Sequence, residues 1–155
     1  EASRDGLRFL VDAYCGVGVF GLSAAARFER VFGVEISAAA VEWARGNAAL
    51  NGIQNADFIL GEAEDLFAGL SVDSGETSVV VDPPRRGCSE AFLEQLIAWA
   101  PARVVYVSCA PDTQARDLPR FLEHGYRITR ARPFDLFPQT RHVENVVSLT
   151  REPAS

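Results

Sequence analysis

A glycine-rich turn between an apolar segment and a run of small residues most constrains how this chain can fold. The first apolar segment, 7–13, is followed by Gly-x-Gly-x-x-Gly, with glycines at Gly16, Gly18 and Gly21. Glycines there let the backbone turn tightly and let a nucleotide-like ligand approach, although close packing of a helix on a strand also requires a glycine. The next predicted strand, 30–34, ends at Glu35, an acid placed to accept hydrogen bonds from two ribose hydroxyls. We therefore expect a nucleoside-containing ligand at this edge of the sheet.

These two signals do not identify the ligand, because NAD and S-adenosylmethionine (SAM) both present an adenosine ribose to such an acid. The turn opens with Asp-Ala-Tyr-Cys at 12–15, which is more typical of SAM enzymes. SAM also lacks the pyrophosphate that a dinucleotide turn is built to hold. A second acid, Glu62, follows the third predicted strand. It is placed either to reach an adenine amino group or to be stabilised by the dipole of a helix N-terminus.

Strand and helix patterns alternate along the rest of the chain, which is typical of an α/β domain with a mostly parallel sheet. The last two predicted strands lie close enough in sequence to form a hairpin. With 155 residues and no internal repeat or linker, the chain is expected to form one domain. The later predicted strands span 56–60, 78–81, 104–109, 126–134 and 145–149, and the predicted helices span 22–26, 38–50, 90–99 and 112–124.

The fourth predicted strand ends in Asp-Pro-Pro-Arg-Arg-Gly at 82–87. Two prolines after a strand fix a rigid, extended lip at the edge of the sheet. Asp82 is then predicted to project into the same crevice as Glu35. A plain turn is the alternative, but an acid followed by two prolines is an uncommon way to end an apolar strand.

The apolar run 104–107 predicts a buried central strand that ends at Cys109, and Pro111 can begin the next helix. Cys109 would lie at the carboxyl end of the sheet, where open α/β folds place their ligands. The alternative is that Cys109 is a small buried apolar residue, as free cysteines usually are. Glu144 belongs to a polar, proline-bearing connection, so it is a candidate for a site rather than for the core.

Composition narrows the function classes. A net charge of −6 argues against a general nucleic-acid-binding surface, although arginines near the motifs could form a local basic patch. The three cysteines are widely spaced and show neither a disulfide framework nor zinc or iron–sulfur spacing, which predicts no metal and a reducing, cytoplasmic setting. No apolar run approaches the length of a membrane span, and no secretion leader is evident.

Taken together, the motifs resemble those of the SAM-dependent RNA uracil-C5 methyltransferases, which make 5-methyluridine in tRNA or ribosomal RNA. The matches run in order along nearly the whole chain, and the combination of the last three is specific. The matching segments are 12–18, 33–35, 51–52, 82–87, 106–111 with Thr113, Arg116 and Asp117, and 135–138 with Thr140, His142 and Glu144.

The resemblance implies an α/β, Rossmann-like class I SAM-dependent methyltransferase fold with a mostly parallel seven-stranded sheet and a C-terminal antiparallel hairpin. It places the family's nucleophile on Cys109 and its general base on Glu144. A thiolate that adds to C6 of uracil turns C5 into a nucleophile for the methyl group, and a base must then remove the C5 proton. Cofactor contacts fall on Tyr14, Glu35, Glu62 and Asp82, and the glycine turn adds Gly16 and Gly18 to the cofactor site. Contacts to RNA phosphates or bases are suggested for Arg85, Arg86 and Arg141, and a solvated surface is their alternative.

Several features depart from the family pattern. Ala110 stands where asparagine usually follows the nucleophile, and Val19 stands where the glycine motif usually carries asparagine. Family members are also much longer and carry an upstream region that helps bind RNA, so 1–155 is expected to be the catalytic domain alone. Two alternatives remain: a SAM-binding module or fragment without independent activity, and an NAD-dependent oxidoreductase, which would leave Cys109 and Glu144 unexplained. The sequence does not indicate an oligomeric state.

Overall fold

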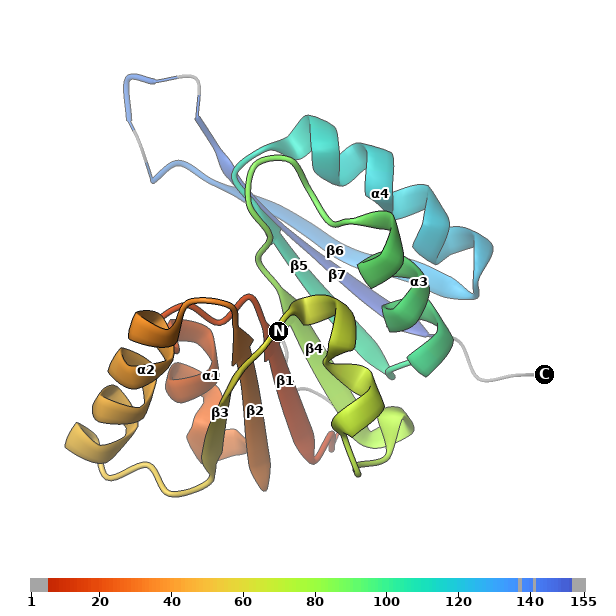
Figure 1. Cartoon of the computed structure of the whole chain (residues 1–155). Coiled ribbons are helices and arrows are strands. Elements are labelled where there is room, and N and C mark those ends of the chain that lie inside the picture. The colour runs from red at the N-terminus through yellow and green to blue at the C-terminus, as the bar shows by residue number, and fades with distance from the viewer. Residues whose placement is uncertain (1–5, 137, 141, 152–155) are drawn as a thin grey trace.

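A seven-stranded sheet organises the computed structural model, which describes residues 6–136, 138–140 and 142–151. The strands lie in the order β3-β2-β1-β4-β5-β7-β6 (Figure 1). Their bounds are β1 (Phe9–Ala13), β2 (Arg30–Glu35), β3 (Ala56–Leu60), β4 (Thr77–Val81), β5 (Arg103–Ser108), β6 (Tyr126–Phe134) and β7 (Glu144–Arg151). The α-helices are α1 (Val19–Ala24), α2 (Ala38–Leu50), α3 (Glu90–Trp99) and α4 (Pro111–Glu123), and short 3-10 turns span Ala25–Arg27, Ala63–Asp65, Phe67–Gly69 and Ser74–Glu76.

The first five strands are parallel, and β7 inserts antiparallel between β5 and β6. The predicted Rossmann-like α/β fold, with a mostly parallel sheet and a C-terminal antiparallel hairpin, is therefore confirmed. The chain leaves β1 first toward β2 and later returns to β4 on its other side, so the strand order reverses between β1 and β4. Open α/β sheets bind their ligands at such a reversal point.

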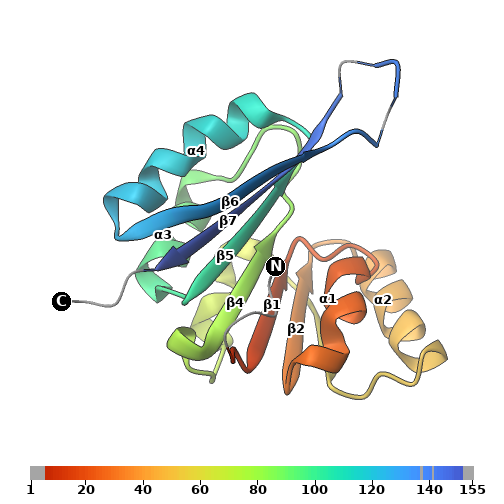
Figure 2. The same ribbon diagram turned by 180° about the vertical axis from the view of Figure 1, so that it is seen from behind.

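The two helix pairs cover opposite faces of the sheet and different strands. α3 and α4 pack on one face over a core that includes Val79, Tyr106 and Phe121 (Figure 1). α1 and α2 pack on the other face, mainly over β1, β2 and β3 (Figure 2). No helix in the described ranges combines the length and apolar character needed to cross a membrane.

Local sequence signals set the helix ends. The Ser37 side chain accepts a hydrogen bond from the Ala40 amide at the start of α2, and Ser89 does the same for Phe92 at the start of α3. Pro111 occupies the first turn of α4, where its missing N–H costs nothing. The first helix begins at Val19, three residues before the predicted start, because Gly18 adopts a left-handed conformation and ends the turn early.

Gly33 lies at a tight contact on β2, beside the edge strand β3. A Cβ at this position would lie 2.5 Å from the Phe58 ring and 3.0 Å from the Cys15 sulfur. Gly33→Ala should therefore lower the free energy of unfolding by about 1–3 kcal/mol through overpacking. Gly46 lies within α2 with open space around it, so Gly46→Ala should instead raise stability by about 0.5–1 kcal/mol. Urea unfolding of both variants checks the prediction, and equal effects of one sign would contradict it.

Candidate active site

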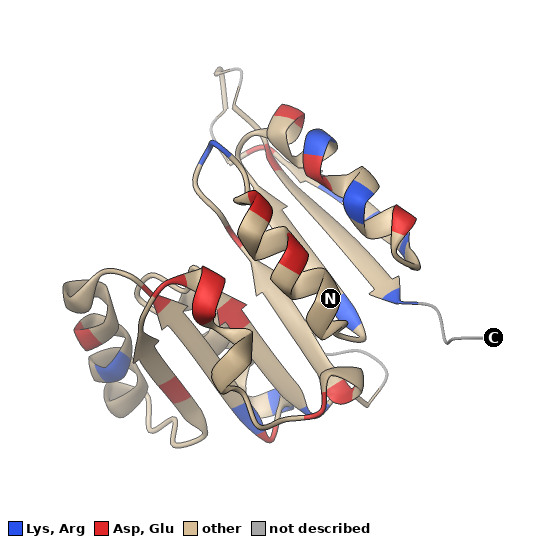
Figure 3. Cartoon of the chain, turned by 45° about the vertical axis from the view of Figure 1, so that its right-hand side comes forward, with Lys and Arg blue, Asp and Glu red and all other residues tan. Residues whose placement is uncertain are grey.

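A cavity of about 480 Å³ opens at the carboxyl ends of the strands, where the sheet order reverses. Its volume is in the range of small-molecule sites. Four of the lining side chains are acids and one is an arginine, so the cavity is strongly negative. Figure 3 shows acids on the segment after β3 and arginines on the connection after β4. The cavity is lined by Tyr14, Val34, Glu35, Ile36, Gly61, Glu62, Ala63, Glu64, Asp82, Pro84 and Arg86.

Glu35 is held at the end of β2 by two backbone amides. Its Oε2 accepts from the Gly16 N–H at 3.1 Å, and its Oε1 accepts from the Ser37 N–H at 2.9 Å. The first amide belongs to the glycine turn and the second to the N-cap of α2. This pair of bonds fixes the carboxylate at the cavity wall, where its remaining acceptor positions can receive hydroxyl donors.

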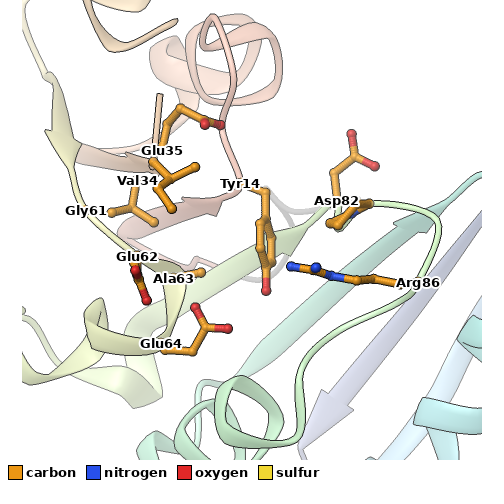
Figure 4. A pocket seen from close by; sticks show the side chains of 11 residues that line it. Tyr14, Val34, Glu35, Gly61, Glu62, Ala63, Glu64, Asp82 and Arg86 are labelled. Atoms are coloured by element: carbon orange, nitrogen blue, oxygen red, sulfur yellow. The ribbon is translucent and has the colours of Figure 1, made fainter. Parts of the chain in front are cut away.

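Tyr14 stands in the middle of the cavity wall. Its backbone is left-handed, with φ of 65°, and this directs the chain from β1 into the glycine turn. Its ring packs edge-on against Phe92, with centroids 5.2 Å apart, and burial raises the pKa of its hydroxyl, which therefore stays neutral. Figure 4 shows Glu35 and Glu62 on one side of the ring, and Asp82 and Arg86 on the other. The ring thus separates a side with two acids from a side where an acid and an arginine lie together.

Cys109 and Glu144 come together because β7 runs antiparallel to β5. The last pair of this ladder joins Ser108 to Asn145. Cys109 follows Ser108 and Glu144 precedes Asn145, so both lie just beyond that pair at the same edge of the sheet. Both are half-buried, whereas a cysteine with only a packing role is usually fully buried.

Asp82 connects this pair to the cavity. Burial and then the charge of Glu144 raise the pKa of Asp82 to about 6. The interaction with Glu144 and the place of Asp82 in the cavity lining put the carboxyl group between the acidic cavity and the Cys109–Glu144 edge. The predicted crevice shared by Asp82 and Glu35 is therefore present.

The lip after β4 is clamped to α4. Thr113 Oγ1 donates to the Arg85 carbonyl at 3.3 Å, and Arg116 Nη2 donates to the Arg86 carbonyl at 3.1 Å. The buried Asp117 carboxylate accepts from the Cys88 amide at 3.1 Å and from the Tyr106 hydroxyl at 2.8 Å. Because Tyr106 lies on β5, Asp117 ties the lip to the strand that ends at Cys109.

The structure separates the remaining candidates by position. Gly16 orients Glu35, whereas Gly18 packs against Phe58 and starts α1, away from the cavity lining. Arg86 lines the cavity, while Arg85 donates to His142 Nδ1 at 3.0 Å. Glu62 is exposed on the cavity wall and also precedes the 3-10 turn Ala63–Asp65, and its contact with an adenine group stays a prediction. The predicted contact at 141 lies outside the described residues, and the other roles stay predictions.

Sequence reasoning missed two buried polar groups. Gln114 is buried on α4, donates to the Tyr106 carbonyl at 2.9 Å and accepts from Asn145 Nδ2 at 2.6 Å, which fixes the start of β7 against β5. Asp12 is fully buried at the end of β1. Its Oδ2 accepts from the Gly21 amide at 2.8 Å, and its Oδ1 has no partner within the described part of the chain. Only the position of Asp12 at a strand end signalled a polar role. Among the described residues, no cluster of histidine, cysteine and acidic side chains is arranged to hold a metal ion.

Asp12 makes stability depend on pH. Burial, more than the nearby Asp82, raises the pKa of Asp12 to about 7. The folded state therefore binds more protons than the unfolded state between about pH 4 and 7, and stability falls as pH rises through this window. Between pH 5 and 8 the wild type should lose about 2–3 kcal/mol more than Asp12→Asn. Urea unfolding at both pH values checks this, with the exposed Asp57→Asn as control; parallel losses in wild type and Asp12→Asn would contradict it.

The fold and the acidic cavity at its reversal point define a Rossmann-like protein of the class I methyltransferase type. The family model of the tRNA (uracil-5-)-methyltransferases matches residues 1–152. The chain belongs to this family.

Individual relatives agree with the family match. The tRNA (uracil(54)-C(5))-methyltransferase of Saccharomyces cerevisiae is 49% identical over 149 residues, which are 93% of this chain and 23% of that protein. An uncharacterized RNA methyltransferase of Bacillus cereus is 47% identical over 97% of this chain and 33% of its own length. The crystal structure of the Pyrococcus abyssi tRNA (uracil-54, C5)-methyltransferase in complex with S-adenosyl-L-homocysteine superposes with a TM-score of 0.81 at 36% identity, covering 92% of this chain and 34% of that one. The chain thus spans about a quarter to a third of these relatives.

Proposed function

We propose that this chain binds SAM in the acidic cavity and transfers its methyl group to C5 of a uridine in tRNA or ribosomal RNA. The observation that carries the proposal is that Cys109 and Glu144 both lie just beyond the last β5–β7 pair at the edge of the sheet, beside an acidic cavity that contains Asp82. Family membership supports the reaction class. The free cysteines agree with a reducing compartment, and we propose a cytoplasmic location.

The charge of the cavity favours SAM over NAD. SAM carries a sulfonium and an ammonium group, whereas the pyrophosphate of NAD carries two negative charges. Four acids and one arginine line the cavity, so electrostatics attract the cationic ligand and repel the dinucleotide. Glu35, fixed by two amides, is suited to ribose hydroxyls. The Pyrococcus abyssi relative was crystallised with S-adenosyl-L-homocysteine, the product that SAM leaves after methyl transfer.

The side chains at the edge of the sheet provide the steps that uracil requires. The thiolate of Cys109 adds to C6, and the electron pair of the C5–C6 bond moves into an enolate. When bound, SAM would supply the methyl carbon: its bond to the sulfonium sulfur would break as C5 bonds to it, and S-adenosyl-L-homocysteine would leave. Glu144 removes the proton from C5, the C5–C6 double bond re-forms, and the thiolate of Cys109 leaves. Cys109 and Glu144 must therefore both reach the same base, and their position at one edge of the β5–β7 ladder supports this.

A second candidate is a cofactor-binding domain that does not act on RNA alone. This candidate is favoured because the chain covers only about a quarter to a third of the relatives' length. Ala110 favours it as well, because it leaves the N-terminus of α4 without a side-chain cap directly after Cys109.

Calorimetry followed by a transfer assay distinguishes these functions. We expect SAM to bind and NAD not to bind under the same conditions, and we expect Glu35→Ala to weaken SAM binding. Exposed Glu42→Ala on α2 is the control. The chain is then mixed with radiolabelled SAM and with tRNA or ribosomal RNA transcripts. Label in 5-methyluridine supports the proposal, label-free RNA with intact SAM binding supports the second candidate, and binding of NAD in place of SAM would overturn both.

A further inference from the structure

In the described part of the chain, no helix covers the sheet face that carries Glu144 over β5, β7 and β6 (Figure 2), and of these strands only β6 is exposed along nearly its whole length, since β5 is buried. α4 packs on the opposite face, where Phe121 meets Tyr126 with ring centroids 5.7 Å apart. Figure 2 shows α1 and α2 beside β1 and β2 on the near side, and no helix in front of β5, β7 and β6. After Tyr126, every residue of β6 is exposed. The edge strand therefore presents its side chains to a possible partner.

A bulge in β6 brings three arginines to this one face. Arg127 pairs with Thr150, Arg130 with Ser148 and Arg132 with Val146. Alternate residues of β7 point to the same face, so their three partners do as well. The extra residue between Ile128 and Arg130 shifts the register, and without it Arg127 and Arg130 would point to opposite faces. The result is a row of guanidinium groups along the strand.

The row ends beside the proposed active site. Arg130, Arg132 and Phe134 line a hollow of about 100 Å³ together with Val146 and Ser148. Arg132 lies over the Phe134 ring, 5.1 Å from its centroid. Phe134 pairs with Glu144, the proposed base, so an aromatic ring lies between the arginine row and the reacting edge.

The charge on this face is opposite to that of the whole chain. On this face β6 and β7 carry three arginines and a single acid, Glu144, in a protein whose net charge is −6. Glu144 lies at the end beside Cys109, and all other charged side chains of the two strands are arginines. A row of arginines that ends at an exposed aromatic ring is the combination with which proteins hold a nucleic-acid backbone and stack a base.

We propose that the open face of β6, through Arg127, Arg130 and Arg132, binds the phosphate backbone of the substrate RNA and leads it toward Cys109 and Glu144. This inference rests on the proposed function, because it takes the RNA to be the substrate. It adds a site that the acidic cavity cannot provide, since that cavity repels phosphate.

The test measures RNA affinity and its salt dependence with the whole chain. A labelled tRNA transcript is titrated by filter binding from low to physiological salt. Arg127→Gln, Arg130→Gln and Arg132→Gln are each compared with Arg120→Gln, an arginine on α4 that pairs with Glu90 on the other face. Each β6 variant should bind about 3- to 10-fold more weakly and lose about 0.7–0.9 from the slope of log K against log salt, whereas Arg120→Gln should match the wild type.

The outcomes separate this inference from the proposed function. The inference would be overturned if all three β6 variants kept the wild-type affinity and salt slope. It would also be overturned if the wild-type chain showed no salt-dependent RNA binding, which is the result expected if protein covers this face instead. SAM binding, measured by calorimetry on the same preparations, should not change in the β6 variants. If RNA binding depends on β6 but the chain does not bind SAM, the proposed RNA-binding surface stands and the proposed methyl transfer is overturned.

Discussion

Cys109→Ala should abolish methyl transfer while leaving cofactor binding intact. Without the thiolate, C5 of uracil is too weak a nucleophile to attack the methyl group, so the single-turnover rate should fall by about 10³-fold or more. Cys109 follows the ladder pair that joins Ser108 to Asn145 and does not itself line the cavity, so the affinity for SAM should stay within about twofold of the wild type. Radiolabel transfer to RNA and calorimetry with SAM give the two readings.

Glu144→Gln is the matched variant, because it keeps Cys109 and removes only the base. Here the thiolate can still add and C5 can still take the methyl group, but the C5 proton cannot leave. A methylated protein–RNA adduct should accumulate, and turnover should fall by about 10²- to 10⁴-fold. Cys88→Ala removes a buried thiol that contacts Tyr106, and it tests whether the loss of a different cysteine also abolishes methyl transfer. Full activity of Cys109→Ala would contradict the assignment of the nucleophile.

Asp117→Ala should cause the largest loss of stability among the polar substitutions. Its carboxylate is buried, accepts from Cys88 and Tyr106, and pairs with Arg116 at 2.8 Å. Removing it leaves two buried donors and one cation without their acceptor, which should cost about 3–5 kcal/mol in the free energy of unfolding. Urea unfolding measures the loss.

Two comparisons identify the cause of that loss. Glu90→Ala removes an exposed ion pair with Arg120 and should cost less than about 1 kcal/mol. The lip between β4 and α3 contains two adjacent arginines, Arg85 and Arg86, after which trypsin can cut. Because Arg116, the ion-pair partner of Asp117, holds the Arg86 carbonyl, trypsin should cut there faster in Asp117→Ala than in Glu90→Ala. Equal cleavage and equal stability in both variants would show that the contacts of Asp117 do not hold the lip in place.

The sequence predicted the order of strands and helices well because each element carried its own local signal. β3, α3 and β6 begin and end at the predicted residues. Their ends are marked by turn residues and caps, such as Ser89, that act within a few residues. The start of α1 was predicted late, since the left-handed conformation of Gly18 depends on its packing against Phe58, a residue on a different strand.

The site could be predicted only in part, for a related reason. Strand ends of a parallel sheet meet at one edge, so Glu35 and Asp82 could be brought together from their positions alone. The register of β7 against β5, which brings Glu144 to Cys109, is set by tertiary contacts such as that between Gln114 and Asn145. The bulge that gathers the β6 arginines on one face has no local sequence signal either. Partners that are far apart along the chain decided each of these features.

The central claim is that Cys109 forms a covalent bond to a uridine in RNA. The most direct test mixes the chain and SAM with tRNA or ribosomal RNA in which uridine is replaced by 5-fluorouridine. Fluorine at C5 cannot leave as a proton does, so the methylated adduct should remain on Cys109. We expect a denaturant-resistant protein–RNA band whose mass includes one methyl group and which is missing with Cys109→Ala. A band that persists in Cys109→Ala, or methylated product without any trapped band, would contradict the account.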